Sequence, residues 1–310
     1  MAAPIILDCD PGHDDAIALL LALASPELEL LGVTTVSGNQ TLEKTTANAI
    51  RVLEFAGRAD DVPVAAGADR PLVRERFVAA YVHGETGLDG PELPPPGRDP
   101  VPQHAVDFIA GRLQGAERPV TLVPVGPLTN IGLLLARYPE LEGRIERVVL
   151  MGGAVAEGNV TPAAEFNIWA DPEAAHRVFQ SGLDVTMIGL DVTHKALLTP
   201  AHADRLRESG RHGRLVAELF DFYHRFHARQ YAFPGSPVHD AVAVAHVLRG
   251  DLVETVDRAV VVDCGGELSR GRTYVDLWRR TDWPVNAHVG VGIDGDAFLE
   301  LLLERIATLG

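Results

Sequence analysis

The chain has 310 residues, enough for one large domain with a sizeable buried core. Hydrophobic residues make up 46% of it and charged residues 23%, close to the average for soluble globular proteins, which argues against a disordered or fibrous protein. The formal net charge of −16, without any run of Lys and Arg, argues against a protein that neutralises the phosphates of a nucleic acid.

The first predicted elements indicate an α/β protein. Buried strands are predicted from short β-branched runs at residues 4–9, 28–36, 120–124, 148–151 and 185–190. Helix patterns fall between them, at residues 14–24, 42–56, 105–113, 130–138 and 172–180. This alternation predicts βαβ units, and so a mostly parallel central sheet with helices on both faces, a Rossmann-like open sheet.

The second half of the chain continues the same domain. A stretch rich in Pro and Gly at residues 84–102 predicts a long surface loop, which in a compact domain is usually functional. After residue 191 the pattern is more helical, and further strands are predicted at residues 259–263, 273–277 and 286–292, before a closing helix at 296–309. Because no linker divides the chain, we expect a single domain over residues 1–310.

The amino terminus and the apolar segments carry no membrane signal. The chain begins MAAPIILDCD, without a basic stretch before an apolar core, and its longest apolar helix pattern, residues 16–24, is too short to cross a bilayer. We therefore expect a cytoplasmic protein with no membrane and no nucleic acid among its partners.

Four aspartates lie within eight positions where the first strand ends, in the sequence IILDCDPGHDDAIALLLALA. Pro11 and Gly12 predict a tight turn, and Asp14 and Asp15 then fall on the first turn of an apolar helix. The carboxylates of this segment meet at the carboxyl end of a strand, where ligands bind in open α/β sheets.

Helix capping could explain one or two of these aspartates, since Asp at a helix start contributes about 0.3–1 kcal/mol. Capping is the preferred interpretation for Asp14 taken alone. For the whole set, the like charges repel and a bound cation would relieve them. Ligation by carboxylate oxygens alone points to Ca²⁺ or Mg²⁺ rather than zinc.

A second acidic cluster, GSPVHDAVAVAHVL, repeats this arrangement with His239 and Asp240 before a buried helix. Taken alone, this pair is more typical of a helix cap. Two such clusters in one chain favour a metal site, because a hard cation that takes about six to eight oxygens needs ligands from distant segments.

These residues resemble the inosine-uridine-preferring nucleoside hydrolase family. The segment DCDPGHDDA is similar to the signature of that family. The similarity continues in order through VTTVSGNQT, VHGETGLDG, LVPVGPLTNI, LMGGAVAEGN, AEFNIWADPEAA and PVHDA. It extends over nearly the whole chain.

The resemblance implies one Ca²⁺ ion held by the carboxylates of Asp10, Asp15 and Asp240 and by the backbone carbonyl of Val125. It also implies a nucleoside as the small-molecule partner and a homodimer or homotetramer as the assembly.

The resemblance further assigns substrate contacts. The ribose hydroxyls are expected to bind Asp14 and Asn39, and the far side of the sugar is expected to bind Asn159, Glu165 and Asn167. The remaining residues are expected around the sugar and base: Met151, Phe166, His83, His239, Tyr231 and His227. Without the resemblance, a helix cap would be the preferred role for Glu165 and Asn167, and a turn for Asn39.

The expected reaction is hydrolysis of the N-glycosidic bond by direct attack of a metal-held water. Asp10 is the expected general base for that water, and a negatively lined pocket would stabilise the oxocarbenium-like transition state. His239, taken with its ordinary pKa near neutrality, is the expected acid for the departing base.

Two other functions share part of this pattern. A phosphatase of the haloacid dehalogenase type also carries a DxD motif after its first strand, but here PGHDD follows that motif, and the later cluster is His-Asp rather than a lysine followed by an acidic pair. A non-catalytic calcium-dependent nucleoside- or ribose-binding protein would keep the pocket without turnover. Release of ribose from any nucleoside would exclude the second alternative.

Overall fold

The computed structural model describes residues 2–310 and contains one eight-stranded sheet. The strands lie in the order β3-β2-β1-β4-β5-β6-β12-β9, and all of them run parallel except β9, which is antiparallel to β12. Their bounds are β1 Ala3–Cys9, β2 Leu28–Thr35, β3 Val64–Ala66, β4 Val120–Pro124, β5 Ile145–Met151, β6 Val185–Ile188, β9 Val253–Arg258 and β12 Ala287–Ile293.

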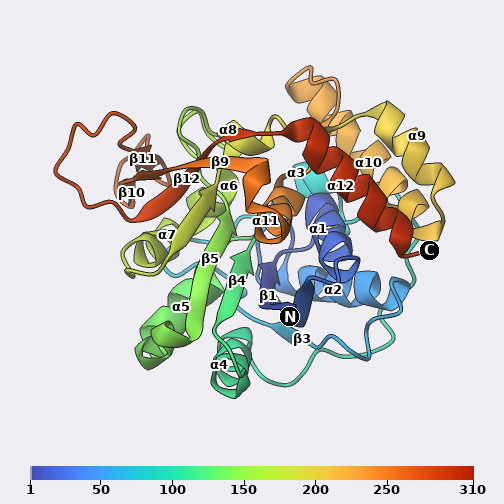
Figure 1. Cartoon of the computed structure of the whole chain (residues 1–310), viewed down its shortest axis with the longest axis horizontal. Coiled ribbons are helices and arrows are strands. Elements are labelled where there is room, and N and C mark those ends of the chain that lie inside the picture. The colour runs from blue at the N-terminus through green and yellow to red at the C-terminus, as the bar shows by residue number, and fades with distance from the viewer. Residues whose placement is uncertain (1) are drawn as a thin grey trace.

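Helices cover both faces of this sheet (Figure 1). One face packs on α1 His13–Leu23, α2 Leu42–Phe55, α11 His239–Leu248 and α12 Gly295–Thr308. The other face packs on α4 Ala105–Gly115, α5 Thr129–Arg137 and α7 Pro172–Phe179. Successive β1 side chains enter opposite cores, Ile5 and Leu7 on the α1 side and Ile6 on the α4 side, because side chains alternate along a strand.

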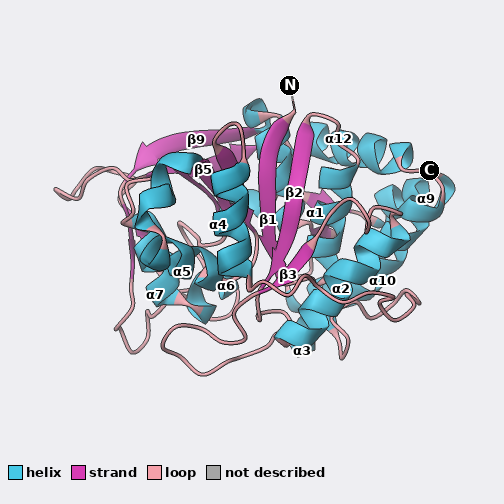
Figure 2. Ribbon diagram, turned by 90° about the horizontal axis from the view of Figure 1, so that it is seen from below, coloured by secondary structure: helices cyan, strands magenta, loops and turns pink. Residues whose placement is uncertain are grey.

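The remaining elements lie around this framework. They are α3 Ala80–His83, α6 Phe166–Ala170, α8 Leu190–Thr193, α9 Pro200–Glu208, α10 Arg211–Gln230 and the 3₁₀ helices Pro139–Arg144 and Gly250–Leu252. Two small antiparallel pairs join β7 Leu197–Leu198 to β8 Ser236–Pro237 and β10 Val260–Val262 to β11 Thr273–Val275. In Figure 2, β1 and β2 run down from the amino terminus, and α3 lies with several loops beyond their carboxyl ends. None of the helices described in residues 2–310 combines the length and apolarity needed to cross a membrane.

The predicted fold class is confirmed: the protein is a single-domain α/β structure with a large, mostly parallel central sheet. The predicted loop at residues 84–102 contains only an isolated bridge between Ala65 and Val101. The predicted strands at 259–263 and 273–277 exist in shorter form, but they pair with each other outside the central sheet. The edge strand β9, VETVDR, was missed because its partly exposed surface carries charged residues and gives no continuous apolar run.

Candidate active site and metal centre

The site lies where the strand order of the sheet reverses. From β1, the chain builds β2 and β3 on one side and β4, β5 and β6 on the other. Loops that leave the carboxyl ends of β1 and β4 therefore diverge, which opens the crevice where ligands bind in this class of sheet. Asp10 directly follows β1, and Val125 directly follows β4.

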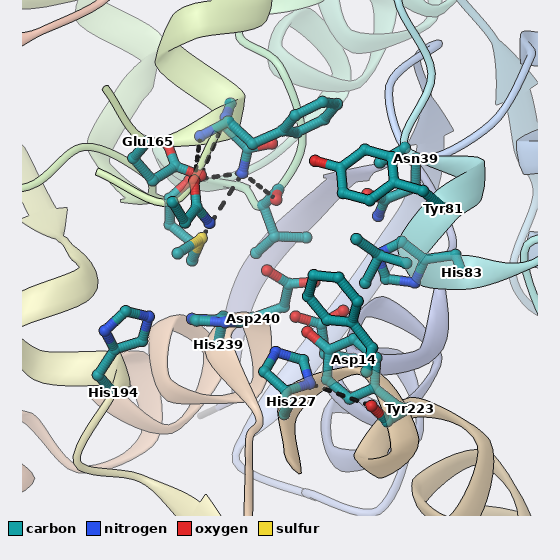
Figure 3. Close-up of a pocket in the computed structure, with 18 of the residues that line it drawn as sticks. Asp14, Asn39, Tyr81, His83, Glu165, His194, Tyr223, His227, His239 and Asp240 are labelled. Carbon is teal, nitrogen blue, oxygen red and sulfur yellow. Dashed lines mark hydrogen bonds between the residues drawn. The ribbon is translucent and has the colours of Figure 1, made fainter. Parts of the chain in front are cut away.

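A cavity opens at this crevice, with about 630 Å³ of empty space when the adjoining open solvent is included. Figure 3 shows Asp14 and Asp240 together in it, with His227 and His239 close by and Glu165 on another side. Twelve of the residues predicted to bind metal or substrate, or to act in catalysis, line the cavity: Asp14, Asn39, His83, Val125, Met151, Asn159, Glu165, Phe166, Asn167, Tyr231, His239 and Asp240. His227 lines it as well.

Three aspartates from two helices converge at the cavity, which Asp14 and Asp240 line and Asp15 does not. Asp14 and Asp15 lie in the first turn of α1, and Asp240 lies in the first turn of α11, which packs against α1. Each offers a carboxylate oxygen, and these three oxygens lie within 4.8 Å of one another. Asp14, which the resemblance assigns to the ribose, therefore also belongs to the group that could hold a metal ion.

Asp10 adjoins this group and is held in one orientation. Its backbone N–H donates to Oδ1 of Asp15 at 3.0 Å, and its own Oδ2 accepts from the backbone N–H of Asn39 at 2.6 Å. Two glycines leave room for its carboxylate: a Cβ at Gly38 would lie 2.1 Å from Oδ2, and a Cβ at Gly126 would lie 2.4 Å from Oδ1. Among residues 2–310, Oδ1 has no hydrogen-bond partner.

This cluster is unfavourable as a set of bare anions. Burial, followed by the charge of Asp15, raises the pKa of Asp10 and that of Asp14 well above the ordinary value for Asp. Burial, followed by the charges of Asp14 and Asp15, does the same to the pKa of Asp240. A divalent cation would stabilise the ionised carboxylates, and an all-oxygen donor set with an unpaired buried oxygen suits a hard cation such as Ca²⁺ or Mg²⁺.

Glu165 organises the wall opposite the aspartates. As the N-cap of α6, its Oε1 accepts from the N–H of Asn167 at 2.9 Å, and its Oε2 accepts from Gly153 at 2.9 Å and Ile168 at 3.2 Å. Glu165 therefore both caps α6, as its sequence context alone suggests, and lines the cavity, as the resemblance implies. Burial raises the pKa of Glu165 to about 7, against the opposing effect of these N–H donors.

Asparagine side chains form hydrogen bonds between the segments that meet at the cavity. Asn167 Nδ2 donates to the carbonyl of Val125 at 2.7 Å and to that of Met151 at 3.1 Å. Asn159 Oδ1 accepts from the backbone N–H of Phe166 at 2.9 Å. Asn39 Nδ2 donates to Asp15 Oδ2 at 2.9 Å, so the turn expected at this residue directs its amide toward the acidic cluster.

Histidines border the other side of the cavity. His83 Nδ1 accepts from the backbone N–H of His13 at 3.2 Å, and His239 Nδ1 lies 2.7 Å from Oγ1 of Thr193. Burial lowers the pKa of His239 well below 6.5, and His194 and His227 reinforce the shift. The ordinary pKa assumed for His239 from the sequence was wrong, because the structure removes its ring from water.

Several lining residues were missed from the sequence: Tyr81, His194, Tyr223 and Phe226. Tyr81 is 57% exposed, and its ring lies 5.9 Å from that of Phe226, which is also near Tyr231 at 6.3 Å. These aromatic rings form part of the rim of the cavity and suit the flat faces of a nucleobase. The spacing of Tyr223, Phe226 and His227 along α10 was the available signal, since residues three or four apart share a helix face.

Fold and site together define an α/β enzyme with an acidic, oxygen-rich centre below a polar and aromatic cavity. The sequence profile described as "Inosine-uridine preferring nucleoside hydrolase" matches residues 5–300. The chain belongs to this family, whose members are N-glycosyl hydrolases that act on nucleosides and generally depend on a metal ion.

Individual relatives match along their whole length. The pyrimidine-specific ribonucleoside hydrolase RihA of Shewanella sp. (strain MR-7) is 52% identical, over 99% of this chain and 97% of the relative. RihA of Photobacterium profundum is 50% identical over 99% and 100%. The solved structure of a purine-preferring ribonucleoside hydrolase from Gardnerella vaginalis superposes with a TM-score of 0.93, at 37% identity over 99% of this chain and 98% of that chain.

Proposed function

We propose that this protein hydrolyses the N-glycosidic bond of pyrimidine ribonucleosides in a calcium-dependent reaction, releasing ribose and the free base. The observation that carries the proposal is the buried group of Asp14, Asp15 and Asp240, with Asp10 beside it, at a cavity lined by polar and aromatic side chains. Burial raises the pKa of the Asp10 and Asp240 carboxyls well above the ordinary value, which favours a site that functions with a cation bound.

Asp10, Asp15, Asp240 and the Val125 carbonyl would hold the ion. When bound, Ca²⁺ would orient the ribose diol and make a neighbouring water more acidic. The geometry of Asp10 supports its role as general base, because Oδ1 is free of hydrogen-bond partners among residues 2–310 while Oδ2 is fixed by Asn39. The water proton would pass to this carboxylate as the oxygen attacks the anomeric carbon.

Other residues would stabilise the separating fragments. Cleavage leaves positive charge on the ribose ring, and the carboxylates of the aspartate cluster and of Glu165 would stabilise that charge electrostatically. Asp14 would accept hydrogen bonds from the sugar hydroxyls and Asn39 would donate to them, since both residues line the cavity. His239 would donate to the departing base. Its neutral ring can act as a hydrogen-bond donor in the manner of an electrophilic histidine.

The preference for pyrimidines rests on relatives. Those at 50–52% identity are named pyrimidine-specific, whereas the purine-preferring neighbour is 37% identical. A homodimer or homotetramer is also proposed, supported by exposed apolar side chains near β10 and β11, including Trp278 and Leu268 at 81% and 88% exposure. Sedimentation velocity would test the assembly. A cytoplasmic location stays a prediction.

The test measures ribose released from uridine, cytidine, inosine and adenosine, with and without a calcium chelator. Wild type is compared with Asp10→Asn and with Asp282→Asn, a control at an exposed position. We expect release from the pyrimidine nucleosides that is lost with chelator and in Asp10→Asn, and retained in the control. If no nucleoside releases ribose while calorimetry shows calcium bound, the non-catalytic binding protein is the correct description.

A further inference from the structure

Thr193 lies behind His239 and outside the lining of the cavity. It ends α8, the short helix that follows β6, and it is fully buried. Its Oγ1 lies 2.7 Å from Nδ1 of His239, the first residue of α11. Within residues 2–310, this ring nitrogen is the one hydrogen-bond partner of the Thr193 hydroxyl. The contact therefore joins two segments 46 positions apart at the edge of the active site.

The chemistry of this contact determines where His239 carries its proton. When a buried hydroxyl has one hydrogen-bond partner and that partner offers a lone pair, the hydroxyl donates its proton to the partner. In any other arrangement the hydroxyl proton would have no acceptor. A neutral His239 then accepts at Nδ1 and must carry its proton on Nε2. A charged ring would carry protons on both nitrogens, with the hydroxyl as acceptor. In both protonation states, Nε2 bears a proton.

Nε2 is the nitrogen that His239 offers to the cavity. Nδ1 is occupied by Thr193, and His239 lines the cavity between Asp240 and the ring of His194, whose centroid is 5.5 Å away (Figure 3). Had Nδ1 held the only proton, a lone pair on Nε2 would face the departing base and repel its negative charge. The tautomer therefore decides whether this histidine helps or hinders cleavage.

We infer that Thr193 is a positioning residue for bond cleavage, whose hydroxyl holds His239 with a proton on Nε2 directed at the departing base. The inference rests on the proposed function. As water attacks, the C1′–O bond forms and the C1′–N bond breaks, with its electron pair going to the base. The Nε2–H donates to that charge. His239 keeps its proton in this hydrogen bond; the departed base takes a proton from solvent, and Asp10 returns to solvent the proton that it took from the attacking water, so the protons balance.

The experiment compares two leaving groups in the same enzyme preparation. Uridine needs a donor for its departing base, whereas the 4-nitrophenolate of 4-nitrophenyl β-D-ribofuranoside leaves readily without one. Thr193→Val removes the hydroxyl at nearly constant volume, and Thr193→Ser keeps it as the matched control. His239→Ala tests the donor role itself. Since both substrates are assayed on one sample, any loss of folded protein cancels in the ratio of their kcat values.

We expect Thr193→Val to lower kcat for uridine about 10- to 100-fold, the size of effect that follows removal of a partner that orients a metal-bound histidine. Its kcat for the nitrophenyl riboside should change less than about threefold, and Thr193→Ser should resemble wild type on both substrates. His239→Ala should show the same selective loss, larger in size. Equal losses on the two substrates in Thr193→Val, or no loss on either, would overturn the inference.

The positioning role of Thr193 and the donor role of His239 can fail separately. If His239→Ala is selective and Thr193→Val is not, the positioning role is wrong and the donor role stands. If His239→Ala itself lowers both substrates equally, or neither, the donor role of the proposed function is wrong and the inference falls with it. Should the riboside not be turned over, ¹⁵N–¹H correlation spectra of histidine-labelled protein decide the tautomer directly. Wild type and Thr193→Ser should show His239 protonated at Nε2, and a proton confined to Nδ1 would overturn the inference.

Discussion

Adding one methyl group at Gly126 should disable the metal centre without removing any polar atom of the protein. In this structure a Cβ at Gly126 would lie 2.4 Å from Oδ1 of Asp10. Carbon and oxygen normally approach to about 3.3 Å, so in Gly126→Ala the carboxylate must move by roughly 1 Å. It cannot retreat easily, because Asn39 holds Oδ2 at 2.6 Å and Gly38 lies against the same oxygen.

The size of the effect follows from that displacement. Overpacking of a rigid site costs about 1–3 kcal/mol of the free energy of unfolding. A misplacement of about 1 Å at a catalytic group lowers the rate by roughly 100-fold. We therefore expect Gly126→Ala to lose about two orders of magnitude in kcat for uridine, together with weaker calcium binding. Ribose release, calcium titration calorimetry and thermal unfolding measure these quantities.

Gly111 provides the matched control. It lies in α4, and a Cβ there would have no neighbour within 4 Å. Gly111→Ala should raise the free energy of unfolding by about 0.5–1 kcal/mol, because alanine loses less backbone entropy in a helix, and should leave kcat unchanged. Wild-type activity and calcium affinity in Gly126→Ala would refute the assignment of Asp10 to the metal centre and to the reaction.

Three further outcomes are expected. Burial raises the pKa of Asp8 to about 7, so the folded protein keeps a proton that the unfolded chain releases from about pH 4 upward. The free energy of unfolding of wild type therefore falls as pH rises from about 4 to about 7. The difference in free energy of unfolding between Asp8→Asn and wild type should grow by roughly 4 kcal/mol in favour of the variant from pH 4 to pH 8, measured by urea unfolding with chelator. Parallel plots of unfolding free energy against pH for the two proteins would contradict this. Calcium at about 100 times its Kd should raise the free energy of unfolding of wild type by about 2.7 kcal/mol, and that of Asp240→Asn far less, as thermal shift would show. Phe298→Ala, at a fully buried position in α12, should cost about 3–5 kcal/mol by chemical unfolding with kcat per folded molecule unchanged, and a marked fall in that kcat would place α12 in the active site.

The sequence was sufficient for features that depend on neighbouring residues. The alternation of apolar runs with helix periodicity predicted a mostly parallel α/β sheet, because each pattern reflects which face of a local element is buried. The segment DCDPGHDDA predicted an acidic turn leading into a buried helix, and α1 does carry Asp14 and Asp15 in its first turn. Edge strand β9 was missed because one partly exposed, charged face removes the apolar signal.

Resemblance to the family supplied residues that local pattern alone would have assigned to capping or turns. Glu165 shows why the two interpretations could not be separated from sequence. Its carboxylate caps α6 through Asn167 and Ile168, and the same carboxylate lines the cavity. A capping motif is visible in a few adjacent residues, whereas membership of a cavity depends on what other segments bring to the same place.

Only the tertiary structure decided how the distant parts of the site meet. The strand order places β1 beside β4 and packs α1 against α11, which brings Asp240 to Asp14 and Asp15. The same packing removes His239 from water and sets its Nδ1 against Thr193, so its pKa lies below that of a free histidine and Nδ1 has a partner that only the folded chain supplies. The sequence by itself determined which chemical groups are present and the local elements that carry them. Their charge states and partners were decided by folding, because burial and contacts between segments far apart in the chain exist only once those segments pack together.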